Sequence, residues 1–455
     1  MQSHSDLTTG NSAALIFKFA LPLYLGNICQ QLYNICDTVI VGRFVGQNAL
    51  AAVGSTGTIM FLINGVASGM GTGFTVLSSQ RYGAGDEDGV SRSVANGILL
   101  SFGISILLTL LCLAIMKPVL RLMNTPEDIF DDALIYIMMI SCGFICVFFY
   151  NLLSALLRAV GNSRMPLIIL VVTSFLNIIL DLFLIVGAGM GTGGAALATV
   201  LSQGISSILC ILYIVRKVPV LRPGKGMWHP DWGDMKEQLR VGVPMALQFS
   251  ITASGSIMMQ SAINLFGSTA VAAVTVSTRI HNVLSQGDYA MGQTMVSYCG
   301  QNYGAKCTER LRKGVHDALG MMSLYSIACG IITMAILEPV MSFFFVEGTD
   351  LEAMLPYARI YSLCCALFYI FLGFVFVFRN SMQGCGYGLY PMLGGVVELV
   401  CRVVLAVAAI HTMNFVLACL CNSLAWVGAG VFDAICWHFV YRKIDREWAE
   451  QEDTM

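Results

Sequence analysis

Long apolar segments recur along the whole of this 455-residue chain, and they limit the folds that it can adopt. A helix needs about 20 predominantly apolar residues to cross a bilayer, and we count about twelve such segments. They lie at 14–38, 50–79, 94–116, 133–157, 166–187, 191–215, 240–264, 270–298, 315–337, 356–379, 390–411 and 414–441. Because lipid offers no partner for backbone polar groups, these segments must be helical. We therefore predict an all-α polytopic membrane protein with twelve transmembrane helices. We also expect the first segment to be retained and not cleaved as a signal peptide.

The composition supports this class and excludes others. The chain is 56% hydrophobic and 11% charged, whereas soluble domains carry about 25% charged residues. The formal net charge of −2 argues against a nucleic-acid partner. The 16 cysteines lie mostly in apolar segments and do not recur with histidine at zinc-site spacing, so we interpret them as buried apolar side chains.

One hydrophilic, basic break divides the chain. It predicts an N-terminal six-helix lobe (1–215), a cytoplasmic linker (216–239), a C-terminal six-helix lobe (240–441) and a cytoplasmic tail (442–455). Basic residues concentrate on the cytoplasmic side of membrane proteins, and this places both termini in the cytoplasm. Only four basic residues then fall on the external side: Arg43, Lys117, Arg121 and Arg359.

The two halves repeat. Gln80-Arg81-Tyr82-Gly83-Ala84 matches Gln301-Asn302-Tyr303-Gly304-Ala305, and Pro22 matches Pro244. Six helices per half is an even number, so both halves run in the same direction and form a parallel repeat, with the expected cavity between the lobes. This architecture favours a transporter.

Two acidic residues interrupt apolar helices, although an ionisable side chain inside hydrocarbon costs at least ~2.5 kcal/mol. Asp37 follows Pro22 by the same interval as Asp181 follows Pro166, which puts each carboxyl roughly 22 Å along its helix from the proline. Both acids end polar stripes at helical spacing. The stripes contain Asn27, Gln30, Gln31 and Asn34 in the first helix and Thr173, Ser174 and Asn177 in the fifth.

A pair of carboxylates with amide and hydroxyl oxygens suits Na⁺ or another hard monovalent cation. The same pair can hold a proton, because burial and a neighbouring like charge favour the neutral carboxyl. The returning sixth helix brings Thr199 to a similar level. A pair of structural, hydrogen-bonded acids is the alternative. We find no nucleophile or metal constellation of an enzyme and predict no cofactor beyond the coupling ion.

The C-terminal half does not copy the acidic pair. Glu398 and Arg402 are spaced for an ion pair within one helix. His281 and Asp288 lie on the expected eighth helix and either line a substrate cavity or provide polar packing. The glycine run Gly69–Gly73 lies inside a span, so we predict close helix packing there instead of phosphate binding.

Together these residues resemble the MATE family of multidrug and toxic compound extrusion antiporters, in its prokaryotic DinF-like branch. The resemblance rests on Pro22 with Asp37, Asn177-x-x-x-Asp181 and the repeated Gln-x-Tyr-Gly-Ala turn. It implies a V-shaped pair of six-helix lobes with alternating access, and export of substrate in exchange for inward H⁺ or Na⁺.

The resemblance also implies residue roles. The family's N-lobe cation site corresponds to Asp37, Asn177, Asp181 and Thr199, with Asn151 close by. Cation loading is linked in some relatives to bending of the first helix near its proline, here Pro22. The NorM-like branch uses acids in helices seven and ten. This chain instead has Gln248 and Gln260 in helix seven and no acid within helix ten, which argues against a NorM-type site.

We therefore expect a secondary antiporter that exports drugs or metabolites, such as organic cations or amphiphiles, across the cell membrane. It is expected to act as a monomer. The substrate-cavity candidates are Gln30, Gln31, Asn34, His281 and Asp288. A flippase for lipid-linked precursors is the first alternative, but it needs a cationic cavity, and the spans contain few bases, chiefly Arg279 and Arg402. A membrane-embedded enzyme is the second alternative.

Overall fold

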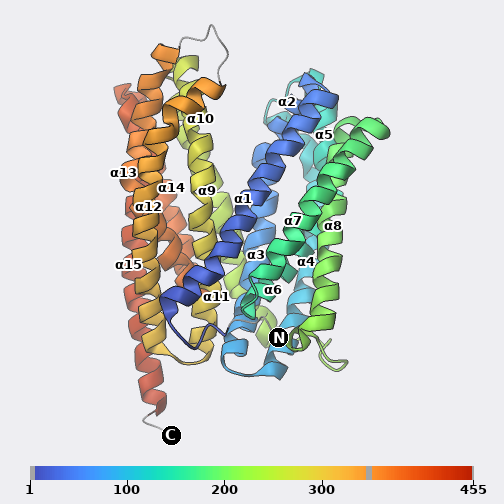
Figure 1. The fold of residues 1–455 in the computed structure, drawn as a ribbon, viewed down its shortest axis with the longest axis vertical. Helices are drawn as coiled ribbons and strands as arrows, with labels where there is room; N and C mark the ends of the chain where they lie inside the picture. The colour runs from blue at the N-terminus through green and yellow to red at the C-terminus, as the bar shows by residue number, and fades with distance from the viewer. Residues whose placement is uncertain (1–5, 345–350, 453–455) are drawn as a thin grey trace. The chain divides into compact units, whose positions relative to one another are not determined.

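The computed structural model describes residues 6–344 and 351–452, and helices form nearly all of that part of the chain (Figure 1). No strand occurs in these two stretches, which confirms the predicted all-α class. The helices are α1 (Ser12–Phe44), α2 (Gln47–Ser55), α3 (Gly57–Gly83), α4 (Glu87–Leu122), α5 (Glu127–Cys142), α6 (Phe144–Ala159), α7 (Arg164–Asp181), η1 (Leu182–Gly187), α8 (Gly191–Lys217), η2 (Pro219–Leu221), α9 (Trp232–Asn264), α10 (Gly267–Leu284), α11 (Gln286–Gly304), α12 (Thr308–Phe344), α13 (Leu351–Gly384), α14 (Leu389–Thr412) and α15 (Phe415–Glu452).

Most of the predicted spans are single long helices, but three are broken. Within the described residues, 10 helices are long and apolar enough to cross a membrane. The helices α5 and α6 are bent by 49° relative to each other at Gly143. If this pair is counted as one broken span, the number of candidate spans in the described residues is 11. The predicted span 50–79 is divided between α2 and α3, and 270–298 is divided at Ser285 between α10 and α11. Neither α10 nor α11 is apolar enough to be counted among these spans, because polar residues occur throughout both.

The chain forms two compact units that exchange short segments. The N-terminal unit contains Leu21–Ala246, and the C-terminal unit contains Leu7–Ala20 and Leu247–Met455. Helices α1 and α9 therefore each pass from one unit to the other, beside Pro22 and Pro244 respectively. The segment 216–239, which we predicted to be a cytoplasmic linker, is grouped with the N-terminal unit, and its location in the cytoplasm stays a prediction.

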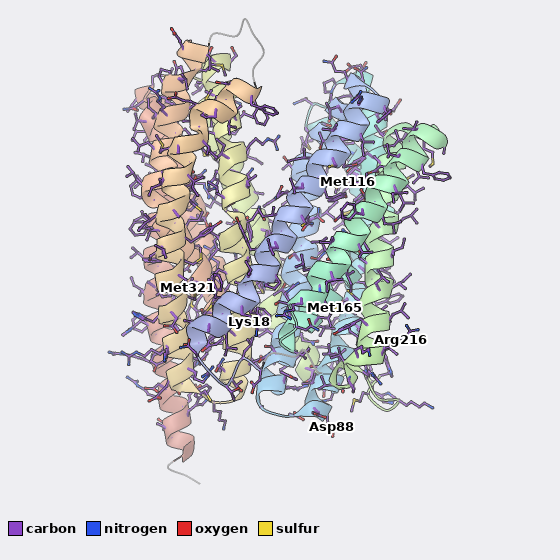
Figure 2. The ribbon with its side chains drawn as sticks, viewed as in Figure 1. Lys18, Asp88, Met116, Met165, Arg216 and Met321 are labelled. Carbon is purple, nitrogen blue, oxygen red and sulfur yellow. The ribbon has the colours of Figure 1, made fainter. Side chains whose placement is uncertain are left out.

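The N-terminal unit is held together by an apolar core between α3 and α6. Phe74 of α3 and Phe148 of α6 are fully buried, and Phe144 packs edge-on against Phe148. The glycine run packs as predicted, because a Cβ added to Gly73 would lie 2.4 Å from the Cα of Gly242. Asp88 lies in the first turn of α4 and Arg216 in the last turn of α8. Figure 2 shows Asp88 and Arg216 at one end of this unit.

The C-terminal unit is organised around α13, which packs against α10, α11, α12 and α15. Tyr361 of α13 is 1% exposed and Trp426 of α15 is 3% exposed, so aromatic side chains fill the centre of this unit. The segment before α1 is bound here through the repeated turn. The Leu7 N–H donates to Gln301 Oε1 (3.1 Å), and Asn302 Nδ2 donates to the Leu7 carbonyl (3.1 Å).

Candidate functional site

Asp37 and Asp181 lie together in the N-terminal unit. Asp37 is on α1, and Asp181 is the last residue of α7, where the helix continues as the π-helical turn η1. Short π-helical segments occur frequently at functional sites. Asp181 is completely buried, and its carboxyl is close enough to that of Asp37 to form a hydrogen bond with it.

Several buried polar atoms at this site lack a protein partner in the described part of the chain. They are Asp37 Oδ1, both carboxyl oxygens of Asp181, and the amide oxygen and nitrogen of Asn177. Ionised carboxylates only accept hydrogen bonds, so the two acids can bond to each other only when one of them is protonated. An unsatisfied buried polar group costs about 1–3 kcal/mol. The donor set therefore fits a proton or a small cation bound between the helices.

Tyr33 and Thr199 complete one side of the site. Tyr33 Oη lies 3.4 Å from Thr199 Oγ1, which links α1 to α8. Tyr33 precedes Asp37 by one helical turn, and its hydroxyl interacts electrostatically with both Asp37 and Asp181. We missed Tyr33 in the sequence, although its i, i+4 spacing from Asp37 was a usable signal.

Tyr136 of α5 is the other tyrosine that sequence reasoning missed. It is 5% exposed, and its hydroxyl interacts electrostatically with Asp37, Asp181 and Tyr33. No local pattern connects Tyr136 with these residues. It also belongs to an apolar cluster with Ile140 of α5 and Ile185 of η1. Apolar walls exclude water and strengthen electrostatic interactions at the site.

Hydroxyl groups continue the polar surface along α7 and α8. Thr173, Asn177 and Asp181 are each 3% exposed or less, so the predicted stripe of α7 faces the interior of the unit. Ser206 Oγ donates to Thr173 Oγ1 (2.9 Å). Ser202 Oγ has no partner among the described residues, and this adds α8 to the helices that present free polar atoms.

The remaining candidates of the N-terminal unit lie on the predicted helices. Asn151 of α6 is half-buried, and its Nδ2 donates to the Val147 carbonyl of its own helix (2.8 Å). On α1, Gln30 and Asn34 are exposed and Gln31 is half-buried. Their roles in cation or substrate binding stay predictions, as does the hinge role of Pro22, which lies inside α1.

The two cavity candidates of the C-terminal unit occupy different helices. His281 of α10 stacks on Tyr369 and on Trp426, at 5.4 Å from each ring, and its Nδ1 lies 3.3 Å from Tyr369 Oη. The helix breaks at Ser285, so the expectation that His281 and Asp288 lie on one continuous eighth helix is wrong. Asp288 instead lies in the first turn of α11.

The predicted ion pair between Glu398 and Arg402 is confirmed, with Arg402 Nη2 at 2.5 Å from Glu398 Oε1. It extends into a buried network, because Arg379 of α13 lies 3.3 Å from Glu398 and 3.4 Å from Asp433 of α15. Arg402 Nε also donates to Asn422 Oδ1 (2.9 Å). Arg379 and Asp433 were missed because neither is near Glu398 in the sequence.

Comparison with known proteins agrees with this arrangement. The family model MatE matches residues 22–183 and 244–408, which together exceed half of the chain. The chain belongs to the MatE family. Its members are multidrug efflux transporters, and the chain is accordingly a multi-pass membrane protein. Each matched segment begins at one of the paired prolines, Pro22 or Pro244.

Two relatives of this chain are named as a multidrug resistance protein and as a DNA damage-inducible protein. The chain is 29% identical to "Probable multidrug resistance protein YpnP" of Bacillus subtilis over 66% of this chain and 67% of that protein. It is 28% identical to "DNA damage-inducible protein F" of Escherichia coli over 66% of this chain and 65% of that protein. The second match agrees with the resemblance to the DinF-like branch.

A solved structure shows the same fold. The "Crystal structure of MATE in complex with MaL6" superposes with a TM-score of 0.91, covering 98% of this chain and 100% of that one. The two sequences are 22% identical, so this likeness concerns the fold alone. It confirms the predicted two-lobed, MATE-like class.

Proposed function

We propose that this chain is a secondary active antiporter that exports drugs or metabolites in exchange for inward H⁺ or Na⁺. The observation that carries the proposal is the buried contact between the Asp37 and Asp181 carboxyls, whose unpartnered oxygens need a proton or a cation between them. Either ion neutralises repulsion between two carboxylates in an apolar surrounding.

The two ions would use the site differently. A proton needs one carboxyl oxygen as its binding atom and the other acid as its hydrogen-bond acceptor. Na⁺ would be held by oxygens of Asp37, Asp181, Asn177 and Thr199, all of which lie on α1, α7 or α8. Asn177 and Thr199 are therefore the residues that distinguish sodium binding from proton binding.

Helix α1 is the element through which ion binding would act on substrate. It carries Asp37, and it also carries the substrate candidates Gln30, Gln31 and Asn34. Pro22 removes one backbone hydrogen bond from α1 and is a natural point of bending. A change in charge at Asp37 that bends α1 would also move these amide side chains.

The substrates we propose are organic cations or amphiphiles. The name of the Bacillus relative, a probable multidrug resistance protein, supports the export of drugs. We place the transporter in the cell membrane as a monomer with both termini in the cytoplasm, in line with the distribution of basic residues.

A flippase for lipid-linked precursors is the weaker alternative. Such a protein needs free cationic groups for a pyrophosphate, but Arg379 and Arg402 are already bound to Glu398 and Asp433.

Transport in proteoliposomes tests the proposal. The purified chain is reconstituted, a pH gradient and a Na⁺ gradient are imposed separately, and the movement of organic cations and neutral amphiphiles is followed. We expect at least one of the two gradients to drive export by the wild-type protein. The same gradient should not drive export by Asp37→Asn or Asp181→Asn. Asp128→Asn, at an exposed acid of α5, is the control and should retain wild-type transport. Transport that responds to neither gradient would overturn the proposal.

A further inference from the structure

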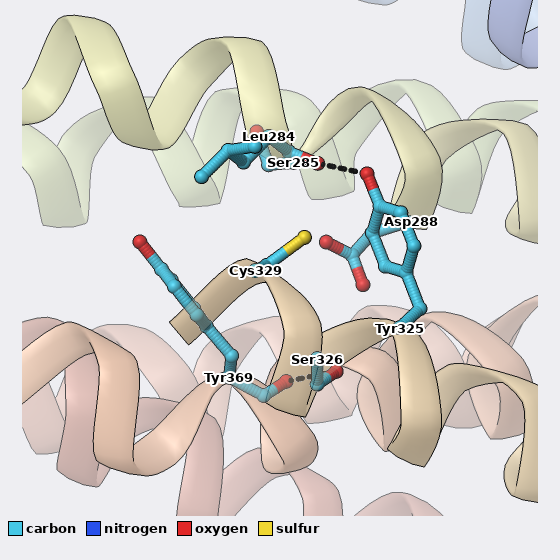
Figure 3. A pocket seen from close by; sticks show the side chains of 7 residues that line it. All are labelled: Leu284, Ser285, Asp288, Tyr325, Ser326, Cys329 and Tyr369. Carbon is cyan, nitrogen blue, oxygen red and sulfur yellow. Dashed lines mark hydrogen bonds between the residues drawn. The ribbon is translucent and has the colours of Figure 1, made fainter. Parts of the chain in front are cut away.

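A small polar cavity lies within the C-terminal unit, between the start of α11 and the helices α12 and α13 (Figure 3). Its volume of about 10 Å³ is enough for one water molecule or one ion of similar size. The polar residues that line it are Ser285, Asp288, Tyr325, Ser326, Cys329 and Tyr369.

The cavity exists because a helix is broken beside it. Helix α10 ends at Leu284 and α11 begins at Gln286, so a backbone carbonyl is left open at the break. Tyr325 Oη donates to this Leu284 carbonyl (2.6 Å). Gly287 permits the contact, since a Cβ there would lie 2.3 Å from the Tyr325 ring. Broken helices inside membrane proteins commonly line binding sites.

Asp288 is the one acidic side chain that lines this cavity. It is 5% exposed, and its Oδ1 has no hydrogen-bond partner in the described chain. In Figure 3 its carboxyl points toward the Cys329 thiol. No described basic side chain forms an ion pair with Asp288, whereas Glu398 and Asp433 of the same unit are both paired with Arg379.

The groups that face Asp288 from neighbouring helices are uncharged in their ordinary states. They are the Tyr325 hydroxyl and the Cys329 thiol, both on α12. The Tyr369 ring of α13 also lines the cavity, with its hydroxyl directed away from Asp288 (Figure 3), and the His281 ring of α10 is stacked on it. An ionised carboxylate would lie here without a compensating charge, which is strongly unfavourable in a buried site.

We propose that Asp288 is a second proton-binding site, separate from the Asp37–Asp181 pair and located within the C-terminal unit. An O–H bond forms at a carboxylate oxygen of Asp288 with a proton from water, and the same proton returns to water when the site opens. The protonated carboxyl would lie in a cavity that the Tyr325 and Ser326 hydroxyls also line, and both of these hydroxyls already donate to the Leu284 and Tyr369 carbonyls.

A proton fits this cavity better than a metal ion does. A small cation needs several oxygen ligands at once, whereas this cavity has a volume of about 10 Å³ and a single carboxylate, and two of its hydroxyls, those of Tyr325 and Ser326, already donate to the Leu284 and Tyr369 carbonyls. Groups of three or more His, Cys, Asp or Glu side chains that could hold a metal are absent from residues 6–344 and 351–452. Proton binding at Asp288 does not depend on the proposed antiport. Only the role of this proton in transport rests on that proposed function.

Infrared difference spectroscopy of the full chain in liposomes tests the proposal directly. Spectra recorded at high and low pH report the carbonyl stretch of protonated carboxyl groups. We expect one such band in wild type to disappear in Asp288→Asn and to persist in Asp37→Asn, in Asp181→Asn and in the exposed control Glu338→Gln. Identical difference spectra for wild type and Asp288→Asn would overturn the proposal.

A second variant keeps the test decisive if Asp288→Asn fails to fold. Cys329→Ser replaces a weak thiol donor with a hydroxyl next to the carboxyl, so the Asp288 band should shift in frequency. An unshifted band would contradict the assignment.

In transport assays, Asp288→Asn should lower the number of protons exchanged per substrate by one. Transport without any ion dependence would contradict the proposed function while leaving the infrared result intact, so the two claims fail separately.

Discussion

At the scale of single residues, Asp37 and Asp181 carry the predicted coupling. Asparagine keeps the shape of each side chain and removes the charge, so neither substitution should prevent folding. We expect gradient-driven export by Asp37→Asn or Asp181→Asn to fall at least about tenfold, equivalent to about 1.4 kcal/mol. The measurement is transport in proteoliposomes at equal protein content, alongside thermal unfolding. Wild-type transport in either variant would show that the pair is structural.

Substitutions of Asn177 and Thr199 should distinguish coupling to Na⁺ from coupling to H⁺. Both supply oxygens that Na⁺ needs and a proton does not. We expect Asn177→Ala and Thr199→Ala to weaken the effect of Na⁺ on thermal stability or tryptophan fluorescence more than the effect of pH. Asn64→Ala is the control, because this exposed amide of α3 donates to the Met60 carbonyl of its own helix. A wild-type protein without any Na⁺ response would contradict the prediction.

At the scale of helices, close packing of α3 against the start of α9 depends on Gly73. A methyl group there would meet the Gly242 backbone at 2.4 Å, and backbone cannot move aside as a flexible side chain can. We expect Gly73→Ala to lower the free energy of unfolding by roughly 1–3 kcal/mol. Gly103 of α4 has nothing within 4 Å of its added Cβ, so Gly103→Ala should be neutral or stabilising. Equal thermal stability of the two variants would refute this account of the packing.

At the scale of the whole molecule, substrate and coupling ion should oppose each other. Lowering the pH protonates the Asp37–Asp181 pair and removes negative charge, so the affinity for a cationic substrate should fall as the pH falls. The measurement is titration of a fluorescent cation across roughly pH 5 to 8. The dependence of affinity on pH should be weaker in Asp37→Asn.

For a neutral substrate, any pH effect must come from helix rearrangement, with Pro22 as the candidate hinge. Affinity that is independent of pH in wild type would mean that the pair is not linked to substrate.

The sequence by itself determined that the long apolar segments are helical, that the chain consists of two similar halves and that Asp37 and Asp181 interrupt apolar helices. Apolar length, helical spacing and basic loop residues are local properties, so they can be read without a structure. The intrahelical Glu398–Arg402 pair was predictable for the same reason.

Only the tertiary structure decided which helices meet. The contact of Asp37 with Asp181, the approach of Tyr136, and the bonds from Arg379 to Glu398 and Asp433 all join residues that are distant in the chain. The break at Ser285, which creates the Asp288 cavity, was also hidden, because its open carbonyl is satisfied by Tyr325 from another helix. Helix rotation and crossing angle set these distances, and they follow from side-chain packing between helices, which no local pattern records.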